Sequence, residues 1–413
     1  MVLAKAHAPN FSEGHYGEIR RNLWKVVPPI FIFLGIAGNA LTVLVLLRRF
    51  RKLSSMSIYL LALTLSNTVI LLSGPLRNWI HSVWETDIRY LSDIGCKVQL
   101  YLTYASIHIS AWLLVAVTWE RTLVMLSPMK ALATFTARNT AVVILGICIV
   151  ISAIDLIVPA MVTLHGVNNL LCAPKTKEWL HFRDSIYEWI DFFLMFAAPI
   201  VFLFVGNAII IFKLQLQRKK IKKMCTFVEK NTSSGQGHAY VLVVALSYMY
   251  VVTITPVSVY HVYFVHRLKQ IRRKFRQDPR GALEEFEFAL LLQTIFYIWS
   301  YLNVTFNFAL YVISCSRFRN DLLEMLQWKK TSKAPESHDP DVATVGKSSD
   351  NGSVMQSNYS LEVSNSAAYC IADPGNAPNG RDVTGYEIKK IGRRNSDRIE
   401  WNETPESQIH NYI

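Results

Sequence analysis

Hydrophobic residues gather in long runs separated by short charged stretches. Six runs contain no Asp, Glu, Lys or Arg: Val26–Leu47, Leu53–Leu76, Val98–Trp119, Phe192–Phe212, His238–Val265 and Phe288–Ser316. A seventh run, Asn139–Leu164, is interrupted only by Asp155, whose insertion costs about 2.5–3.5 kcal/mol, less than its apolar neighbours return. A helix of about 20 residues crosses the hydrocarbon core of a bilayer. The pattern therefore predicts an all-α membrane protein, a seven-transmembrane helix bundle.

The composition agrees with this interpretation. The chain of 413 residues is 51% hydrophobic and 18% charged, with a mean hydropathy of +0.23, whereas soluble domains are about 25% charged. Six cysteines are too few for a disulfide framework. The formal charge is +13, and the segment 267–280 alone carries seven Lys or Arg residues. When that segment is set aside, the positive-inside rule places the C-terminus in the cytoplasm.

The runs divide the chain into four parts. We expect an extracellular N-terminus over 1–25 without a signal peptide, a seven-transmembrane bundle over 26–316, a cytoplasmic amphipathic helix over 317–328 and a disordered cytoplasmic tail over 329–413. Asn10 begins the glycosylation sequon Asn10-Phe11-Ser12 and is predicted to lie outside the cell. The expected location is the plasma membrane, with several membrane passes.

Spaced motifs within the runs carry a resemblance to a known family. They are Gly38-Asn39, Cys96 at 25 residues before Arg121, Glu120-Arg121-Thr122, Pro199, Pro256, Asn307-Phe308-Ala309-Leu310-Tyr311 and Arg317–Leu323. Together they resemble the rhodopsin-like (class A) G-protein-coupled receptors. The Asn-Phe-x-x-Tyr form of the last helix looks most like invertebrate neuropeptide receptors of the FMRFamide-receptor kind. Phe308 departs from the family pattern, which has Pro there.

The resemblance implies several residue roles. A disulfide is expected between Cys96 and Cys172, which lie on one face of the membrane. Glu120 is expected to hold Arg121 at rest, and Arg121 then meets a G protein on activation. The same resemblance implies that activation also uses a further set of residues: Pro256, Asn307 and Tyr311.

Two negative observations narrow the ligand. Thr103 stands where amine receptors carry an Asp, and Tyr301 stands where opsins carry the Schiff-base Lys. An amine ligand is thus disfavoured and retinal is excluded. Helical spacing predicts a peptide pocket lined by Arg77, Gln99, Thr103, Tyr104, His261, Gln293 and Tyr297.

Three features remain open at this stage. Arg77 either clamps a ligand carboxylate or carbonyl, or it snorkels to the membrane interface or pairs with Glu85 or Asp87. His108 and Asp155 are either ligand contacts or, as we favour, bonds between helices. The basic segment 267–280 either captures an acidic ligand, continues a solvated helix or meets anionic headgroups.

The expected partners are an extracellular peptide, a heterotrimeric G protein, arrestin and membrane lipids, and no nucleic acid. No cofactor or metal site is expected, and the chain is not predicted to be an enzyme because it lacks His-Glu-x-x-His and Gly-x-Ser-x-Gly. The alternatives are a receptor for a small acidic or lipid ligand, or a transporter, which would need paired broken helices that this sequence does not have.

Overall fold

The computed structural model describes residues 14–48, 54–129, 134–166, 171–224 and 234–331. All of them belong to one compact unit, residues 1–332 with 397–413, while a second unit, 333–396, lies outside the described residues. The predicted glycosylation site Asn10 also lies outside them. So does the predicted tail, apart from residues 329–331, which belong to a helix.

Seven helical stretches in the described part of the chain are long and apolar enough to cross a membrane. The first four are α1 (His15–Arg48), α2 (Ser55–Ser73) with α3 (Pro75–Trp84), α4 (Asp93–Leu126), and α6 (Ala137–Asp155) with α7 (Ile157–Met161). The fifth consists of α8 (Lys177–Phe182), η3 (Arg183–Tyr187), α9 (Glu188–Phe192), η4 (Phe193–Ala197) and α10 (Ala198–Met224). The last two are α11 (Ser234–Lys274) and α12 (Pro279–Ser314). The predicted seven-helix bundle is confirmed.

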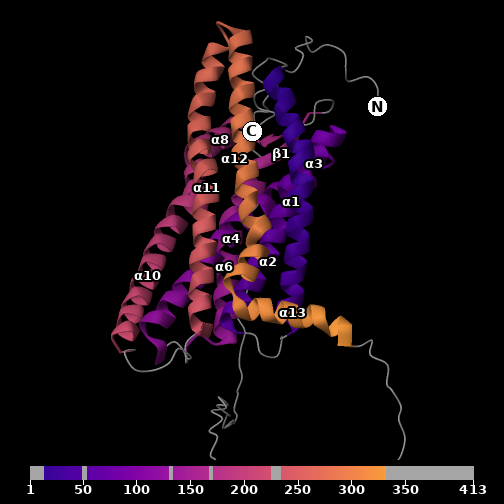
Figure 1. Ribbon diagram of the computed structural model, residues 1–413. Helices are drawn as coiled ribbons and strands as arrows, with labels where there is room; N and C mark the ends of the chain where they lie inside the picture. Colours follow the sequence, from indigo (N-terminus) through magenta and orange to yellow (C-terminus); the bar gives the residue numbers. More distant parts are fainter. Residues whose placement is uncertain (1–13, 49–53, 130–133, 167–170, 225–233, 332–413) are drawn as a thin grey trace, which may run out of the picture. The chain divides into compact units, whose positions relative to one another are not determined.

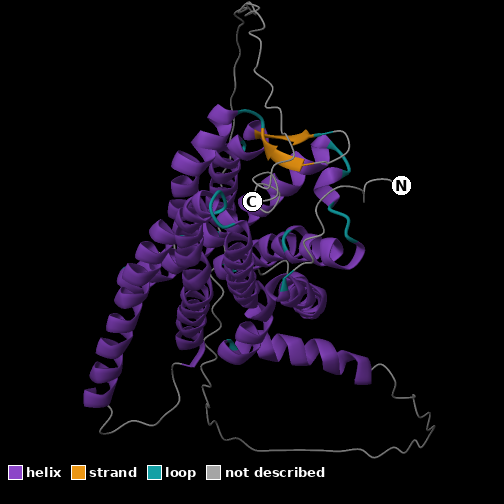
Figure 2. Ribbon diagram, turned by 90° about the horizontal axis from the view of Figure 1, so that it is seen from above, coloured by secondary structure: helices purple, strands orange, loops and turns teal. Residues whose placement is uncertain are grey.

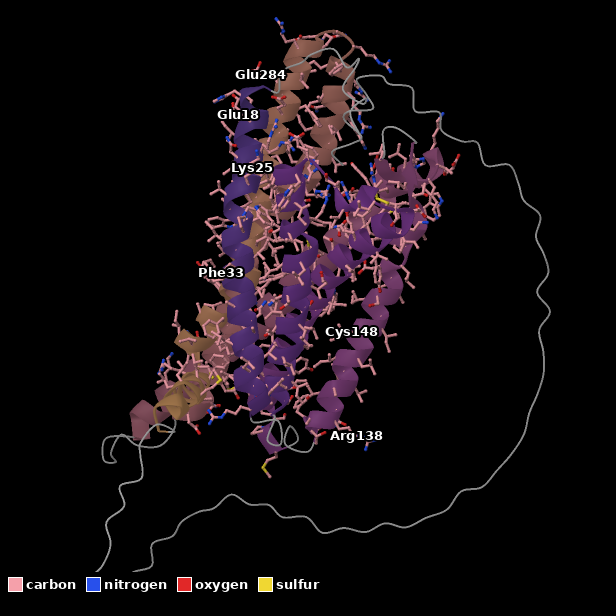
Figure 3. All side chains as sticks on the ribbon, turned by 90° about the vertical axis from the view of Figure 1, so that its right-hand side faces the viewer. Glu18, Lys25, Phe33, Arg138, Cys148 and Glu284 are labelled. Carbon is pink, nitrogen blue, oxygen red and sulfur yellow. A yellow bond between two sulfur atoms is a disulfide. The ribbon has the colours of Figure 1, made fainter. Side chains whose placement is uncertain are left out.

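The bundle is arranged around α4, which contacts α2, α6, α10 and α11, while α12 packs against both α1 and α11 (Figure 1). The outer faces remain apolar. Phe33 on α1 is 74% exposed, and the half-exposed Cys148 lies on the outer helix α6 (Figure 3). Such faces suit hydrocarbon surroundings, because large apolar side chains gain nothing from contact with water.

A last helix, α13 (Ser316–Thr331), crosses one end of the bundle (Figure 1). Phe318 anchors it, since its ring packs at 5.8 Å from Tyr311 and 6.1 Å from Phe308 between ring centroids. The predicted eighth helix over 317–328 is therefore present, with slightly wider bounds.

The opposite end carries a short hairpin of two strands (Figure 2). Strand β1 (Val162–His165) pairs antiparallel with β2 (Leu171–Pro174), and the disulfide between Cys96 and Cys172 ties β2 to the first turn of α4. The predicted disulfide is confirmed. The prediction of helix through Leu164 is wrong from Val162 onward, because this segment pairs with β2. We call this side of the bundle the disulfide end.

Several helices run further toward the disulfide end than the apolar runs predict. α1 begins at His15, the fifth span begins at Lys177, and α11 continues to Lys274. Charged residues mark where hydrocarbon ends, but capping decides where a helix ends. Asp278, for example, accepts a hydrogen bond from the backbone N–H of Gly281 at 2.9 Å and starts α12.

The protruding parts of α11 and α12, residues 264–290, form what we call the outer hairpin. They enclose a separate apolar cluster of Phe264, Leu268, Ile271, Ala282, Phe286, Ala289 and Leu290. Arg267 and Lys274 of α11 pair with Glu285 of α12. The helix therefore continues through most of the basic segment, whereas the action of its charges on a ligand or on headgroups stays a prediction.

Gly38 provides a test of the contact between α1 and α12. A Cβ atom at this position would lie 2.8 Å from Cβ of Phe308, closer than carbon atoms pack. We predict that Gly38→Leu destabilises the protein by about 1–3 kcal/mol through overpacking, measured as a lower midpoint of thermal inactivation in detergent.

Gly146→Leu on α6 is the matched control, since a Cβ atom there meets nothing within 4 Å. Equal midpoints for the two variants would contradict the close approach of α1 to α12.

Candidate functional site

A cavity of about 710 Å³ opens inside the bundle toward the disulfide end. Its walls come from α1, α3, η2 (Ile88–Tyr90), α4, η3, α9, α11 and α12. Its charged lining consists of Arg20, Arg21, Arg77, Glu85, Asp87, Arg89, Arg183, Asp184, Glu188, Asp191, Lys269 and Arg272. A volume of this size suits a drug-sized ligand or the end of a peptide.

All seven residues of the predicted pocket line this cavity: Arg77, Gln99, Thr103, Tyr104, His261, Gln293 and Tyr297. The structure therefore brings the predicted set together. Whether these side chains bind a ligand stays a prediction.

The cavity has an apolar and aromatic floor. The deepest lining residues on their helices are Ile107, Met195, Val257 and Tyr301, whereas Lys269 and Arg272 line the mouth on the outer hairpin. Asp191 lies seven residues, about 10 Å of helix, deeper than Asp184. Polar and charged side chains occupy the levels between mouth and floor.

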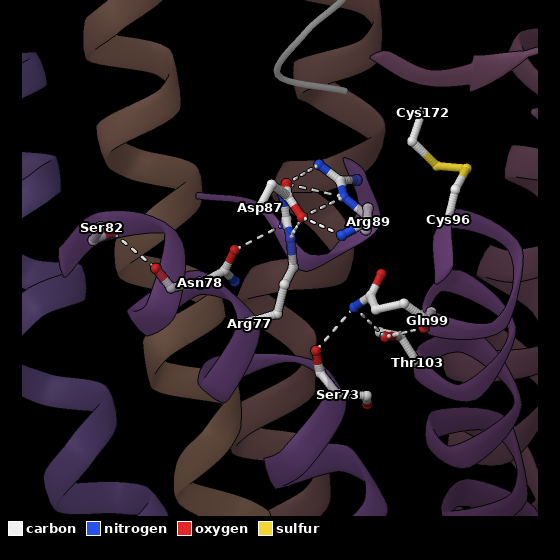
Figure 4. A network of polar contacts seen from close by, with 10 residues as sticks. All are labelled: Ser73, Arg77, Asn78, Ser82, Asp87, Arg89, Cys96, Gln99, Thr103 and Cys172. Atoms are coloured by element: carbon white, nitrogen blue, oxygen red, sulfur yellow. Dashed lines mark hydrogen bonds and ion pairs between the residues drawn. A yellow bond between two sulfur atoms is a disulfide. The ribbon is translucent and has the colours of Figure 1, made fainter. Parts of the chain in front are cut away.

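An ion cluster forms the wall between α3 and η2 (Figure 4). Arg77 donates from Nε to Oδ1 of Asp87 at 3.2 Å, pairs again through Nη2, and donates from Nη1 to Asn78 at 3.0 Å. Arg89 donates to the same carboxylate from Nε and Nη2 at 3.1 and 2.9 Å. Of the alternatives for Arg77, the structure therefore shows pairing with Asp87. Arg77 lines the cavity as part of this ion cluster.

Two arginines share one buried carboxylate in this cluster, so it carries net positive charge. Although burial raises it, the hydrogen bonds and charges of Arg77 and Arg89 hold the pKa of Asp87 well below its usual range. The Asp87 carboxylate is only 1% exposed. It therefore stays ionised and keeps both guanidinium groups in place.

Gln99 and Thr103 form the adjoining wall on α4. The Gln99 side-chain amide donates to the Ser73 carbonyl at 2.9 Å and to Oγ1 of Thr103 at 3.2 Å, while Thr103 donates to the backbone carbonyl of Gln99 (Figure 4). Oε1 of Gln99 is buried and has no partner among the described residues. This atom is an acceptor available to a ligand donor.

His261 and Glu188 join α11 to α9 across the cavity. Nε2 of His261 lies 2.6 Å from Oε2 of Glu188, and Nδ1 of His261 is buried without a partner in the described part of the chain. The pair links the helix that carries Pro256 to the fifth span. Glu188 is not indicated by the sequence pattern, which starts this span only after the charges.

Deeper in the bundle, His108 contacts two carboxylates, those of Asp155 and Asp191. Nδ1 of His108 lies 3.0 Å from both carboxylate oxygens of Asp155, and Nε2 lies 3.0 Å from Oδ1 of Asp191. His108 is 1% exposed and Asp155 is fully buried. The favoured interpretation, a bond between helices, agrees with this geometry for α4 and α6. Asp191, which faces the cavity, was missed for the same reason as Glu188.

Four of the five residues assigned to activation, Glu120, Arg121, Asn307 and Tyr311, lie toward the α13 end of the bundle. Glu120 pairs with Arg121 and also accepts hydrogen bonds from Ser55 and Thr140. Asn307 and Tyr311 are 5% and 1% exposed on α12. The described contacts match the expected resting pair, while the switching roles stay predictions.

Pro256 lies inside α11 and leaves the carbonyl four residues earlier without its helical partner. Nε1 of Trp299 on α12 donates to that Val252 carbonyl at 3.2 Å. The interruption in α11 is therefore held by a hydrogen bond from the neighbouring helix.

Comparison with known proteins adds a family. The family described as 7 transmembrane receptor (rhodopsin family) matches residues 38–311, from the last third of α1 to near the end of α12. The match takes in all seven predicted pocket residues and, toward the α13 end, Glu120, Arg121, Asn307 and Tyr311.

Individual relatives are more distant. Cysteinyl leukotriene receptor 1 of Homo sapiens is 22% identical over 256 residues, covering 60% of this chain and 72% of that receptor. Cysteinyl leukotriene receptor 2 of Homo sapiens is 26% identical over 150 residues, covering 34% and 40%. The urotensin-2 receptor of Homo sapiens is 32% identical over 96 residues, covering 23% and 24%. None of these three is an invertebrate neuropeptide receptor, so that finer resemblance stays a prediction.

The ion cluster generates a stability prediction. Asp87→Asn leaves two guanidinium groups beside a neutral amide, and removing one partner of a buried ion pair costs about 3–5 kcal/mol. We expect a clearly lower thermal midpoint for the purified protein at pH 7. Because the folded-state pKa of Asp87 lies below the ordinary 3.8, this contribution is fully present above about pH 4 and is lost only as the pH falls through the lowered pKa.

Glu85→Gln serves as the control, because the Glu85 side chain is 78% exposed and lies 3.9 Å from Arg21. A surface pair of this kind contributes about 0–1 kcal/mol. Equal thermal midpoints for Asp87→Asn and Glu85→Gln would contradict a stabilising role for the Asp87 cluster.

Proposed function

This chain belongs to the rhodopsin family of seven-transmembrane receptors, and from that membership we propose that it is a plasma-membrane receptor for an extracellular peptide. The peptide binds in the cavity at the disulfide end, which faces outward with the N-terminus. Binding activates a heterotrimeric G protein at the opposite end. Arrestin and anionic membrane lipids are further partners on the cytoplasmic side.

The observation that carries the proposal is that the cavity and the outer hairpin adjoin at one end of the bundle. The cavity accepts the end of a ligand, and the outer hairpin continues its wall beyond the span through a core of its own. Phe264, Leu268 and Leu290 line the cavity and also belong to that core. A small molecule fills the cavity alone, whereas a peptide also uses the surface above it.

The charge of the mouth supports a ligand that presents an anionic group. Lys269 and Arg272 line the cavity from the outer hairpin, and Arg77 and Arg89 contribute net positive charge from the opposite wall. Positive potential around a low-dielectric cleft raises the capture rate of an acidic ligand, and salt screens that effect. A free C-terminal carboxylate or an acidic side chain satisfies this requirement.

The α13 end supports coupling to a G protein. Arg121 is held by Glu120 near the end of α4, and Glu120 is buried among hydroxyl groups from α2 and α6. Breaking this pair releases a guanidinium group at the membrane face. A receptor that rests with the pair closed has a defined contact to open on activation.

A small acidic or lipid ligand is a second candidate. It is favoured by the longest of the three alignments, which is to a receptor named for leukotrienes, and by the positive wall formed by Arg77 and Arg89. Such a ligand would occupy the cavity without using the outer hairpin. The two candidates are therefore separable by variants of that hairpin.

The proposal is tested by calcium and cyclic-AMP responses in cells expressing the full chain. The probes are peptide pools divided into amidated and free-carboxylate members, each acidic or basic, with a parallel pool of long-chain fatty acids. A response to peptides and none to fatty acids supports the proposal. A response to fatty acids alone replaces it with the second candidate, and silence to every pool removes both.

Neutralising the outer hairpin generates a quantitative prediction. The triple substitution Arg272→Gln, Arg273→Gln and Lys274→Gln should weaken the potency of acidic peptides about tenfold, because it removes three charges from the mouth. Added salt should weaken the response of the wild type more than that of the variant.

Lys175→Gln with Lys177→Gln is the control, since these residues lie at the same end but do not line the cavity. An unchanged potency in the triple variant would refute the role of the outer hairpin in reading ligand charge.

A further inference from the structure

The carboxylates that line the cavity fall into two groups by their partners. Near the mouth, Asp87 pairs with two arginines, Asp184 pairs with Arg183 and Glu85 lies beside Arg21. Deeper down, the partners change. Among the described residues Glu188 and Asp191 pair with histidines only, and neither contacts an Arg or Lys side chain.

The deep group is short of positive charge. It consists of the carboxylates of Asp155, Asp191 and Glu188 and the imidazoles of His108 and His261. If both imidazoles are protonated, two positive charges face three negative ones, and a neutral imidazole increases the imbalance. Buried charge without a partner costs several kcal/mol. The deep end of the cavity therefore carries excess negative charge.

The two cavity-lining carboxylates each present an oxygen to the open space. Oδ1 of Asp191 and Oε2 of Glu188 hold the histidines, while Oδ2 and Oε1 make no hydrogen bond in the described part of the chain. The two residues are three apart in one helix, so they lie on the same face. Together they offer two acceptors to one donor group.

An independent observation comes from Tyr187. Its side chain is 2% exposed, and its hydroxyl has no hydrogen-bond partner among the described residues. Its ring lies 5.7 Å from that of Tyr104, which lines the cavity. A buried hydroxyl without a partner costs free energy that a bridging water recovers.

The backbone of the segment is adapted to this position. α9 carries Glu188 and Asp191 and is flanked by two π-helical turns, η3 and η4. A π-turn inserts a residue into a helix and rotates the residues that follow, and such turns occur frequently at functional sites. Both acids between these turns line the cavity.

We infer that Asp191 and Glu188 form the seat for a cationic group of the ligand, a guanidinium or an alkylammonium. The inference rests on the proposed function and deepens it: the ligand carries an anionic group at the mouth and a cation at the deep end. A guanidinium can donate to both free carboxylate oxygens at once, and the aromatic side chains of Tyr104 and Tyr297 line the same cavity.

The first experiment measures binding without signalling. The full chain, purified in detergent, is melted with benzylguanidine or with neutral benzylurea, as wild type and as Asp191→Asn. Benzylguanidine should raise the wild-type midpoint more than benzylurea does, and Asp191→Asn should abolish the difference. The empty Asp191→Asn protein should itself melt higher than the empty wild type, because the substitution removes an uncompensated charge and keeps an acceptor for His108.

Glu188→Gln repeats the test at the second carboxylate. Glu178→Gln is the control for the loss of one negative charge, since Glu178 is exposed on α8 and outside the cavity. Equal stabilisation by the two probes overturns the inference. So does a lower midpoint for empty Asp191→Asn, which would mean that the charge is already balanced within the protein.

The second experiment uses signalling. Peptide pools that contain arginine are compared with matched pools in which citrulline, its neutral isostere, replaces it. The arginine pools should be at least tenfold more potent on the wild type, and Asp191→Asn should bring the ratio close to one. Equal potency on the wild type overturns the inference and leaves the proposed function standing. Silence to all peptides defeats the proposed function, and the melting experiment then decides this inference alone.

Discussion

The bundle depends on polar side chains that pair with each other where no water is present to pair with them. A buried donor or acceptor in hydrocarbon must be satisfied inside the protein. Asn39 donates to Thr68 between α1 and α2, and Ser110 donates to Asn67 between α4 and α2. Ser66 donates to a backbone carbonyl of α4. These bonds fix how the helices are rotated about their axes, which apolar packing alone leaves loosely determined.

The same requirement explains how the site is held together. The cavity walls come from segments far apart in the sequence, and polar contacts join them: Arg77 and Arg89 through Asp87, α9 and α11 through His261. His108 joins α4 to both α6 and α9. Each of these contacts crosses between elements close to the cavity. The cavity is therefore bounded by ion pairs as well as by packing.

Much of the fold follows from the sequence, because hydrophobic length reports the spans directly. Helical spacing counted from Cys96 and the Pro residues also predicts the pocket residues, and all of them line one cavity. What the sequence pattern misses lies next to charges. Asp191 directly precedes an uncharged run, so the pattern starts the fifth span at Phe192, whereas the helical stretch begins at Lys177. The acids of α9 therefore lie outside the predicted span.

The sequence pattern also does not predict which acid pairs with Arg77. Arg77 has Glu85 and Asp87 as neighbours in sequence, and only the fold of η2 places the second under its guanidinium group. The sequence of the β1–β2 hairpin shows no clear alternation of apolar and polar residues, because each strand has only four residues. Such strands are too short for a period of two to be recognised. Contacts that depend on tertiary placement need the structure.

One further consequence concerns α11 as a mechanical element. Pro256 lies 18 residues from Lys274 and 22 from Ser234, or about 27 and 33 Å along the axis. The outer arm is stiffened against α12 by the outer hairpin's own core. The Trp299 hydrogen bond lies at the interruption between two segments of similar length. A rigid rotation of α11 about Pro256 would therefore move its two ends by similar distances in opposite directions.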